Sequence, residues 1–331
     1  MGNFKAYRIR QNDSAIHSGF ETVSLDDLTV GDVVIKVIYS GINYKDALAA
    51  TGKGKILRQY PLNGGIDLSG IVTNSSDPRF IAGQPVLVVG AGLSEYLDGG
   101  YAEYCRVPVR CVVPLPDGLS LFEAMALGTA GFTAALAVTR IEDIGQDKHL
   151  GPVVVTGATG GVGSIAIDIL SSRGYEVVAY TGKSDKHDYL KSIGASSILD
   201  RQSVDFGSKP LEKAQWGAAI DNVGGETLAW LTRTIKPWGN IASIGLAGGT
   251  KLETTVMPFI LRGVSLIGIN SIEMPVAVRD QVWKSLGSDM KPHFFDKIVS
   301  RVIDFDELPN VFSDYIESAN TGRTVVRIGV E

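Results

Sequence analysis

Cysteine and histidine are scarce in this sequence of 331 residues. It contains two cysteines, Cys105 and Cys111, and four histidines. Two cysteines are too few for a disulfide framework, and their spacing does not match a structural zinc knuckle. We therefore expect two reduced thiols and a cytoplasmic location.

Long apolar runs and strong net charge are also missing. The longest charge-free apolar stretch, residues 124–138, is shorter than the roughly 20 residues that span a bilayer. The first ten residues contain no apolar signal-peptide region, and Ala6 stands where a myristoylation site needs Ser or Thr. The net charge of −5 offers no basic surface, so we expect neither nucleic acid nor membrane as a partner.

Glycine and apolar residues are abundant. The chain has 39 glycines in 331 residues, nearly twice the usual share of about 7%, while 44% of its residues are hydrophobic. Many glycines in an apolar chain indicate tight turns and close backbone approaches rather than disorder. The length suggests about two domains.

Two patterns divide the chain. Residues 1–120 contain short β-branched runs, such as 33–38 and 84–89, separated by turn residues. From about residue 121, apolar strands alternate with helical stretches such as 163–173 and 227–236, which is typical of parallel βαβ units. Six such strands are predicted, at 152–156, 176–180, 197–199, 218–221, 240–244 and 265–269.

This alternation predicts an α/β protein with a doubly wound Rossmann sheet. We assign residues 121–294 to that cofactor domain and residues 1–120 with 295–331 to a β-rich substrate domain. The strand-like segment 322–328 is expected to rejoin the first domain.

A dinucleotide-binding loop follows the first of the six strands. Residues 157–163, Gly-Ala-Thr-Gly-Gly-Val-Gly, match the pattern G-x-G-x-x-G with Ala158 in the first position. Gly160 lets the backbone approach a pyrophosphate, and Gly163 allows close packing of helix on strand. The following helix directs its free N–H groups at the phosphates. The predicted contacts are Thr159, Gly160, Gly161 and Val162.

The end of the second strand indicates which nicotinamide cofactor binds. An NAD enzyme usually has Asp or Glu here to bind the ribose 2′-hydroxyl, but this sequence has Thr181, Gly182 and Lys183. A lysine with hydroxyl neighbours suits a 2′-phosphate, so NADPH is the predicted cofactor. Lys183 as a solvated turn residue is the alternative, and Asp185 could in principle serve NAD. Since ligands of open sheets lie at the carboxyl ends of the strands, Asn222, after the fourth strand, is a further predicted contact.

The motifs together resemble a known family. Segments 41–46, 64–72, 128–133 and 258–262 and the glycine loop are similar to the acrylyl-CoA reductase and quinone oxidoreductase-like branch of the zinc-free medium-chain dehydrogenase/reductase superfamily. The resemblance implies a GroES-like fold for the β-rich domain. Asn43 and Ile66 stand where the zinc-dependent alcohol dehydrogenases have a cysteine and a histidine, so no metal is expected.

The resemblance also implies a catalytic region. Tyr44 is expected beside the nicotinamide, where a phenol could orient a substrate carbonyl or pass a proton; packing under the cofactor is the alternative. Asn43 and Asp46 are candidate catalytic residues, although their spacing also fits a helix cap. Asp67 replaces a glutamate found near the zinc, and could hold the surroundings of Tyr44 or Lys45.

Further contacts are expected from the same resemblance. Leu246 and Ser271 follow the fifth and sixth strands and are expected near the nicotinamide half of the cofactor. Asn320 and Arg323 are candidates to reach the cofactor or a CoA phosphate. For Arg323, a surface salt bridge is an equally good interpretation. A homodimer through the last sheet strand, near residues 266–269, is implied as well.

These features lead to one main hypothesis and two alternatives. Without a Lewis acid, hydride delivery to the β-carbon of an activated alkene is favoured over carbonyl reduction, since it needs only hydrogen bonds to the developing enolate. The main hypothesis is NADPH-dependent reduction of a short 2-enoyl thioester such as acrylyl-CoA. The alternatives are reduction of quinones or free enones, and a sensor or interaction protein that binds NADPH without turnover.

Overall fold

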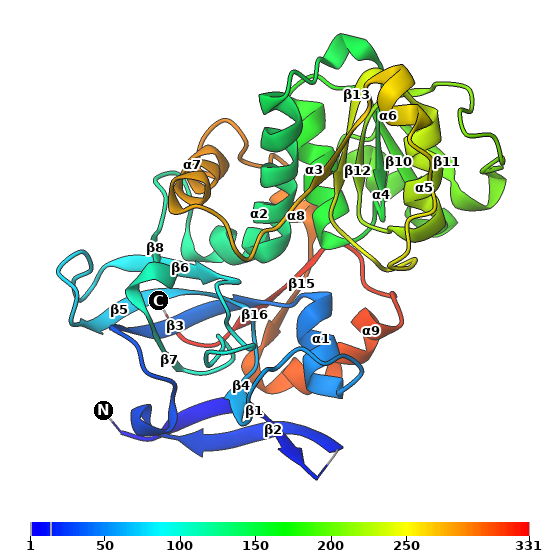
Figure 1. Ribbon diagram of the computed structural model, residues 1–331. Coiled ribbons are helices and arrows are strands. Elements are labelled where there is room, and N and C mark those ends of the chain that lie inside the picture. Colours follow the sequence, from blue (N-terminus) through cyan, green and yellow to red (C-terminus); the bar gives the residue numbers. More distant parts are fainter. Residues whose placement is uncertain (1, 14, 331) are drawn as a thin grey trace. The chain divides into compact units, whose positions relative to one another are not determined.

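The computed structural model describes residues 2–13 and 15–330, and it separates into two compact units (Figure 1). The first unit comprises the described residues up to Thr129, Ile272–Asp280 and those from Val299 onward. The second unit comprises Ala130–Ser271 and Gln281–Ile298. Each unit has its own sheets.

The second unit is built on a six-stranded parallel sheet with the order β11-β10-β9-β12-β13-β14. This is the doubly wound Rossmann order, and it confirms the predicted fold class. The central strand is entirely buried, as its continuous apolar sequence requires. The strands are β9 (Val153–Thr156), β10 (Val177–Thr181), β11 (Ser197–Asp200), β12 (Trp216–Asp221), β13 (Ile235–Ser243) and β14 (Ser265–Gly268).

Helices connect these strands by crossovers, so the helices of the two halves cover opposite faces of the sheet, α3 on one side and α5 on the other (Figure 1). Each predicted strand overlaps an observed one, and the predicted helices correspond to α3 and α5. The helices are α3 (Gly161–Ser172), α4 (His187–Ser192), α5 (Gly225–Thr234), α6 (Met257–Arg262) and α8 (Phe295–Ile298), while α7 (Val276–Leu286) begins in the first unit and ends in the second.

The first unit contains a larger sheet in the order β15-β16-β3-β5-β6-β8, with β7 also paired to β3, and a small sheet β2-β1-β4. Because β16 pairs with β3, the C-terminal segment rejoins the N-terminal part of the chain as predicted. The strands are β1 (Phe4–Asn12), β2 (Ala15–Val23), β3 (Val33–Gly41), β4 (Leu62–Asn63), β5 (Asp67–Ser75), β6 (Pro85–Val89), β7 (Tyr104–Val107), β8 (Val113–Pro114), β15 (Val299–Asp304) and β16 (Arg323–Arg327).

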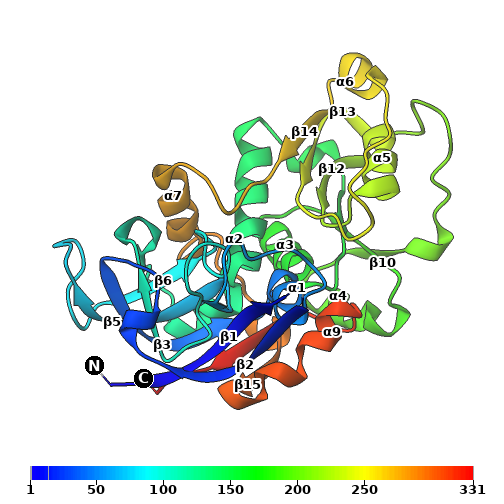
Figure 2. The ribbon, with the colours of Figure 1, turned by 60° about the horizontal axis from the view of Figure 1, so that its bottom comes forward.

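Two short helices complete the first unit. Helix α1 (Tyr44–Thr51) follows β3, and α9 (Phe312–Ile316) precedes β16. They lie side by side over the strands, as Figure 2 shows, although more than 260 residues separate them in the sequence. Their apolar faces share one buried cluster that includes Leu57, Tyr101 and Phe312. This cluster holds the N-terminal end of α1 in place.

Helix α2 (Leu121–Asp143) explains why the unit boundaries differ from the predicted ones. The sequence suggested a change of domain at residue 120, whereas α2 begins at Leu121 and the N-terminal segment of the first unit extends along it to Thr129. The helix is interrupted at Gly128, whose φ of 50° and ψ of −153° are not helical. By length and composition α2 could cross a membrane, but 83% of its most apolar window is buried inside the protein, as in a core helix.

Candidate functional site

The glycine loop in the second unit has the geometry that a pyrophosphate needs. Gly157 has a φ of 57°, and a Cβ on Gly163 would lie 2.8 Å from Ala158 Cα, so both positions require glycine. Gly160 is the N-cap of α3 and has no side chain to bond the helix end. The first N–H groups of α3 have no intrahelical partner and are available to an anion.

The end of β10 carries cationic side chains rather than a carboxylate. The backbone N–H of Lys183 donates to Thr181 Oγ1 at 3.1 Å, which fixes the turn. Burial lowers the pKa of the Lys183 ammonium, and an anion beside it would favour the charged form. Asp185, the possible NAD ligand, is paired with Lys186 at 3.0 Å.

Arg201 is a second cation at this place, and the sequence analysis missed it. A Cβ on Gly182 would lie 3.1 Å from both Nε and Nη2 of Arg201, so the guanidinium lies directly against the Gly182 backbone. Arg201 follows β11, the strand beside β10, and parallel neighbours end at the same edge of the sheet. That adjacency was the available sequence signal.

The end of β12 holds a buried polar group that needs a partner. Asn222 donates from Nδ2 to Thr156 O at 2.8 Å, and Thr156 Oγ1 donates to Asp221 Oδ1 at 2.7 Å. These bonds fix the side chain of Asn222, yet its Oδ1 atom is buried and accepts no hydrogen bond from the residues described. A ligand hydroxyl at this edge would satisfy it.

The remaining predicted contacts of the second unit lie at the same edge of the sheet. Leu246 follows β13 and is 62% exposed, which is unusual for a leucine and leaves its side chain accessible to a ligand. Ser271 follows β14. The loops that follow five neighbouring strands at this edge carry Thr159, Gly160, Gly161, Val162, Thr181, Gly182, Lys183, Asn222, Leu246 and Ser271.

In the first unit, the N-terminal end of α1 forms a separate polar cluster. Asn43 is the N-cap, and Asp46 Oδ2 accepts its backbone N–H at 2.8 Å in a capping box. Asp46 Oδ1 accepts the Ile66 N–H at 2.9 Å. The helix-cap interpretation of Asn43 and Asp46 therefore describes their geometry.

Asp67 lies beside this cap and is completely buried. Its carboxylate accepts from Asn43 Nδ2 at 2.8 Å, from Thr129 N at 2.9 Å and from Thr129 Oγ1 at 2.5 Å. Burial, and then the charge of Asp67, raise the pKa of Asp46 to about 7 although three N–H donors favour its ionised form.

The comparisons with known proteins agree with this arrangement. Residues 161–286 match the family described as zinc-binding dehydrogenase, and residues 29–117 match the alcohol dehydrogenase GroES-like domain. YhfP of Bacillus subtilis, which carries the name of a quinone oxidoreductase, is 47% identical over 98% of this chain and 99% of its own length. The acrylyl-CoA reductase AcuI of Ruegeria pomeroyi is 43% identical over 92% of this chain and 93% of its own.

The chain belongs to the acrylyl-CoA reductase and YhfP-like branch of the medium-chain dehydrogenase/reductases. Solved structures of this branch have the same fold. The yhdH oxidoreductase from Salmonella enterica in complex with NADP gives a TM-score of 0.95 at 45% identity, covering 98% of this chain and all of that one. Bacillus subtilis yhfP with NAD bound gives 0.96 at 47% identity, covering 99% of this chain and all of that one.

Asn43 and Ile66 are the two positions at which the resemblance predicted the loss of zinc ligands. Asn43 and Ile66 offer an amide and a buried aliphatic side chain. Among residues 2–13 and 15–330, no three His, Cys, Asp or Glu side chains come together in a way that could hold a metal ion. The Asn43 amide instead bridges the two carboxylates of Asp46 and Asp67.

The structure corrects the expectation for Arg323. Its side chain is 2% exposed, so it forms no surface salt bridge, and its guanidinium is used internally rather than offered to a CoA phosphate. It donates to the carbonyl oxygens of Ile42 and Ala126 at 2.9 Å and to Asn43 Oδ1 at 3.2 Å.

The expectations for Lys45, Tyr44 and Asn320 have different outcomes. Lys45 pairs with Glu95, not with Asp67, so the suggested Asp67–Lys45 contact is wrong. Tyr44 is the first residue of α1, is 47% exposed, and its phenol has no hydrogen-bond partner among the residues described. Asn320 lies half-buried between α9 and β16, where its backbone N–H donates to Asp314 O. Its contact with a cofactor stays a prediction.

Proposed function

We propose that this protein is an NADPH-dependent oxidoreductase that reduces the C=C bond of a short 2-enoyl thioester such as acrylyl-CoA. The observation that carries the proposal is the end of β10, where Lys183 and Arg201 stand in place of the carboxylate that would select NAD. The 43% identity to an acrylyl-CoA reductase supports the substrate class. The NADP complex of a 45% identical relative supports the cofactor.

The second unit fits NADPH at several points. The free N–H groups of α3 suit the pyrophosphate, and the cations Lys183 and Arg201 suit the 2′-phosphate. The buried Oδ1 atom of Asn222 suits a ribose hydroxyl. Thr159, Gly161 and Val162 would line the pyrophosphate, while Leu246 and Ser271 would lie towards the nicotinamide. A contact of Asn320 with the cofactor remains part of the proposal.

Tyr44 is the residue of the first unit that we assign to the chemistry. When bound, NADPH would supply the hydride for the new C–H bond at the β-carbon, and the alkene electron pair would move onto the thioester carbonyl. An exposed phenol can donate a hydrogen bond to that carbonyl oxygen, or a proton to the α-carbon that completes the saturated product. Asp46 and Asp67 are too buried for this role, and the Asn43 amide is bonded to both carboxylates, so we assign all three to the support of α1.

Reduction of a quinone or a free enone is the second candidate. The name of the 47% identical YhfP favours it, and the same hydride geometry would serve it without any contact to a CoA tail. Among the described residues, we find one dinucleotide-binding loop and no second fingerprint of a flavin site.

The test is a comparison of acceptors. Purified protein is mixed with NADPH and acrylyl-CoA, a simple quinone, or a free enone such as methyl vinyl ketone, and the absorbance of the reduced nicotinamide is followed; NADH is run in parallel. Rapid oxidation with the thioester and a preference for NADPH is expected. Turnover with the quinone or the free enone alone would move the protein to the second candidate. Tight NADPH binding without any turnover would indicate a non-catalytic sensor.

We also propose that two copies associate through β14 and that the protein works in the cytoplasm. Strand β14 is an edge strand with free backbone groups, and the nearby segments carry the exposed apolar residues Trp238, Ile260 and Leu261. Two buried free thiols suit a reducing compartment. Light scattering should give twice the monomer mass, and Leu261→Glu should shift it towards the monomer.

A further inference from the structure

The break in α2 is the starting point. The helical segment before Gly128 ends with carbonyl groups that have no intrahelical partner, and the segment after it begins with N–H groups in the same state. Arg323 donates to two of those carbonyls, at Met125 and Ala126, and Asp67 accepts the N–H of Thr129. A cation therefore caps one helix end and an anion caps the other.

Both charged groups are fixed by this arrangement. They are 2% and 0% exposed and lie 3.9 Å apart. A Cβ on Gly128 would collide with Asp67 Oδ2 and would lie 2.7 Å from Arg323 Nη2, so the pair packs directly against the glycine backbone. Neither side chain can turn towards solvent without leaving a buried charge unpaired.

The same pair forms hydrogen bonds with both polar atoms of the Asn43 side chain. Arg323 Nη1 donates to Asn43 Oδ1 at 3.2 Å, and Asn43 Nδ2 donates to Asp67 Oδ2 at 2.8 Å. Asn43 is the N-cap of α1, and Tyr44 is the next residue. Since no described residue bonds the Tyr44 phenol, its direction depends on the backbone at the N-terminal end of α1.

We propose that Asp67 and Arg323 are positioning residues that act through Asn43 to fix the Tyr44 side chain. Tyr44 has no side-chain partner of its own, so loss of the pair allows the first turn of α1 to move and the phenol to lose its direction. The kinetic part of the test rests on the function proposed above, whereas its spectroscopic part does not.

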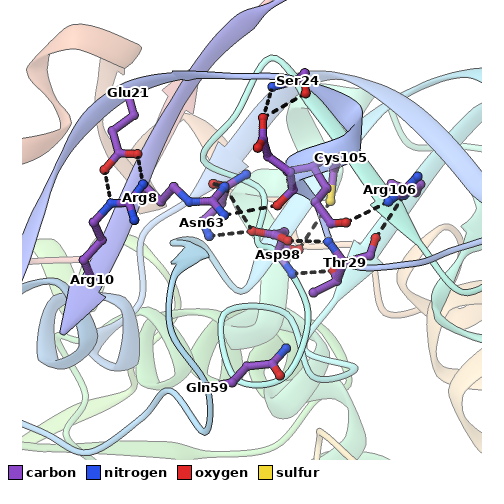
Figure 3. Close-up of polar contacts among 12 residues, drawn as sticks. Arg8, Arg10, Glu21, Ser24, Thr29, Gln59, Asn63, Asp98, Cys105 and Arg106 are labelled. Atoms are coloured by element: carbon purple, nitrogen blue, oxygen red, sulfur yellow. Dashed lines mark hydrogen bonds and ion pairs between the residues drawn. The ribbon is translucent and has the colours of Figure 1, made fainter.

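The first unit offers a matched control pair. Arg8 and Asp98 form a second buried ion pair at 3.8 Å, with side chains 6% and 1% exposed (Figure 3). Asp98 accepts hydrogen bonds from the backbone N–H groups of Thr29 and Asn63, and neither residue lies on α1 or α2. Asp98→Asn therefore tests the cost of disturbing a buried pair without touching Asn43.

The experiment uses Asp67→Asn and, in case that variant folds poorly, Asn43→Ser, which retains a good N-cap residue but cannot bridge Asp67 and Arg323. The protein is labelled with 3-fluorotyrosine, which gives up to 11 signals, and the Tyr44 signal is assigned by its loss in Tyr44→Phe. We expect it to shift or broaden in both variants and to stay unchanged in Asp98→Asn. An unchanged Tyr44 signal in Asp67→Asn and Asn43→Ser overturns the proposal, whether or not the protein reduces a thioester.

The kinetic measurement adds a second criterion. Asp67→Asn and Asn43→Ser should lower kcat by about 10-fold to 100-fold and leave the KM for NADPH within about twofold, because a misplaced reacting group affects the chemical step. Tyr44→Phe should cost less in the Asp67→Asn protein than in the parent. Fully additive losses would contradict a role that acts through Tyr44.

Discussion

Asp46 and Asp67 share one hydrogen-bond donor: the Nδ2 atom of Asn43 lies 3.2 Å from Asp46 Oδ2 and 2.8 Å from Asp67 Oδ2. Both carboxylates are buried, at 2% and 0% exposure. The single Asn43 amide therefore lies between two carboxyl groups that are both shielded from solvent. The cost of charging both is expressed in the pKa of Asp46, which burial and then the Asp67 charge raise to about 7.

The first prediction concerns stability against pH. Since the folded-state pKa of Asp46 is about 7 and its unfolded value is about 3.9, the folded state binds more protons between these values. Asp46 should make the free energy of unfolding fall as pH rises from about 4.5 to 7, by at most about 1.4 kcal/mol per pH unit. Above pH 7 its contribution should be constant.

Urea unfolding of the parent and Asp46→Asn between pH 4.5 and 8 measures this slope. Asp77→Asn is the control, because hydrogen bonds from Arg79 lower the pKa of Asp77 to about 2, outside the window. The difference between parent and Asp46→Asn should vary with pH below 7, and that for Asp77→Asn should not. A pH-independent difference for Asp46→Asn would show that Asp46 is already ionised in the folded protein at low pH.

How far the sequence predicted the molecule depended on the range of the interactions. The Rossmann sheet and the glycine loop were predictable because strand periodicity and G-x-G-x-x-G spacing are local. The contacts of Arg201 and Arg323 were harder to predict, because each joins residues that are remote in the sequence: Gly182 is 19 positions from Arg201, and Asn43 is 280 from Arg323. The position of the break in α2 also depends on remote residues, since Asp67 and Arg323 bond the backbone on either side of Gly128.

The second prediction concerns the choice of cofactor. Lys183→Ala and Arg201→Ala should each weaken NADPH binding by roughly 1–3 kcal/mol and leave NADH binding unchanged, because only the 2′-phosphate contact is lost. Isothermal titration with both cofactors measures the two affinities. Lys186→Ala is the control, since Lys186 is paired with Asp185. Equal losses for NADPH and NADH would remove Lys183 and Arg201 from the phosphate site.

The third prediction concerns the exposed phenol of α1. Tyr44→Phe should lower kcat with the thioester by about 100-fold or more, because the hydroxyl acts on the developing enolate, and should leave the KM for NADPH nearly unchanged. Tyr96→Phe, a change at another half-exposed tyrosine of the first unit, should have no effect. Steady-state kinetics at saturating NADPH decides this, and a Tyr44→Phe enzyme with the parent kcat would leave Tyr44 as a packing residue only.

The fourth prediction uses two glycines with positive φ. Gly128, at φ 50° and ψ −153°, packs against the Asp67–Arg323 pair, whereas Gly145, at φ 88°, has open space around its Cβ position. Gly145→Ala should cost only backbone strain, about 1 kcal/mol, while Gly128→Ala should cost about 2–5 kcal/mol because its methyl group also displaces a buried ion pair. Chemical denaturation compares the two. Equal losses of stability would mean that the Asp67 and Arg323 side chains move easily to accommodate the methyl group. The pair would then be too mobile to fix the position of Tyr44.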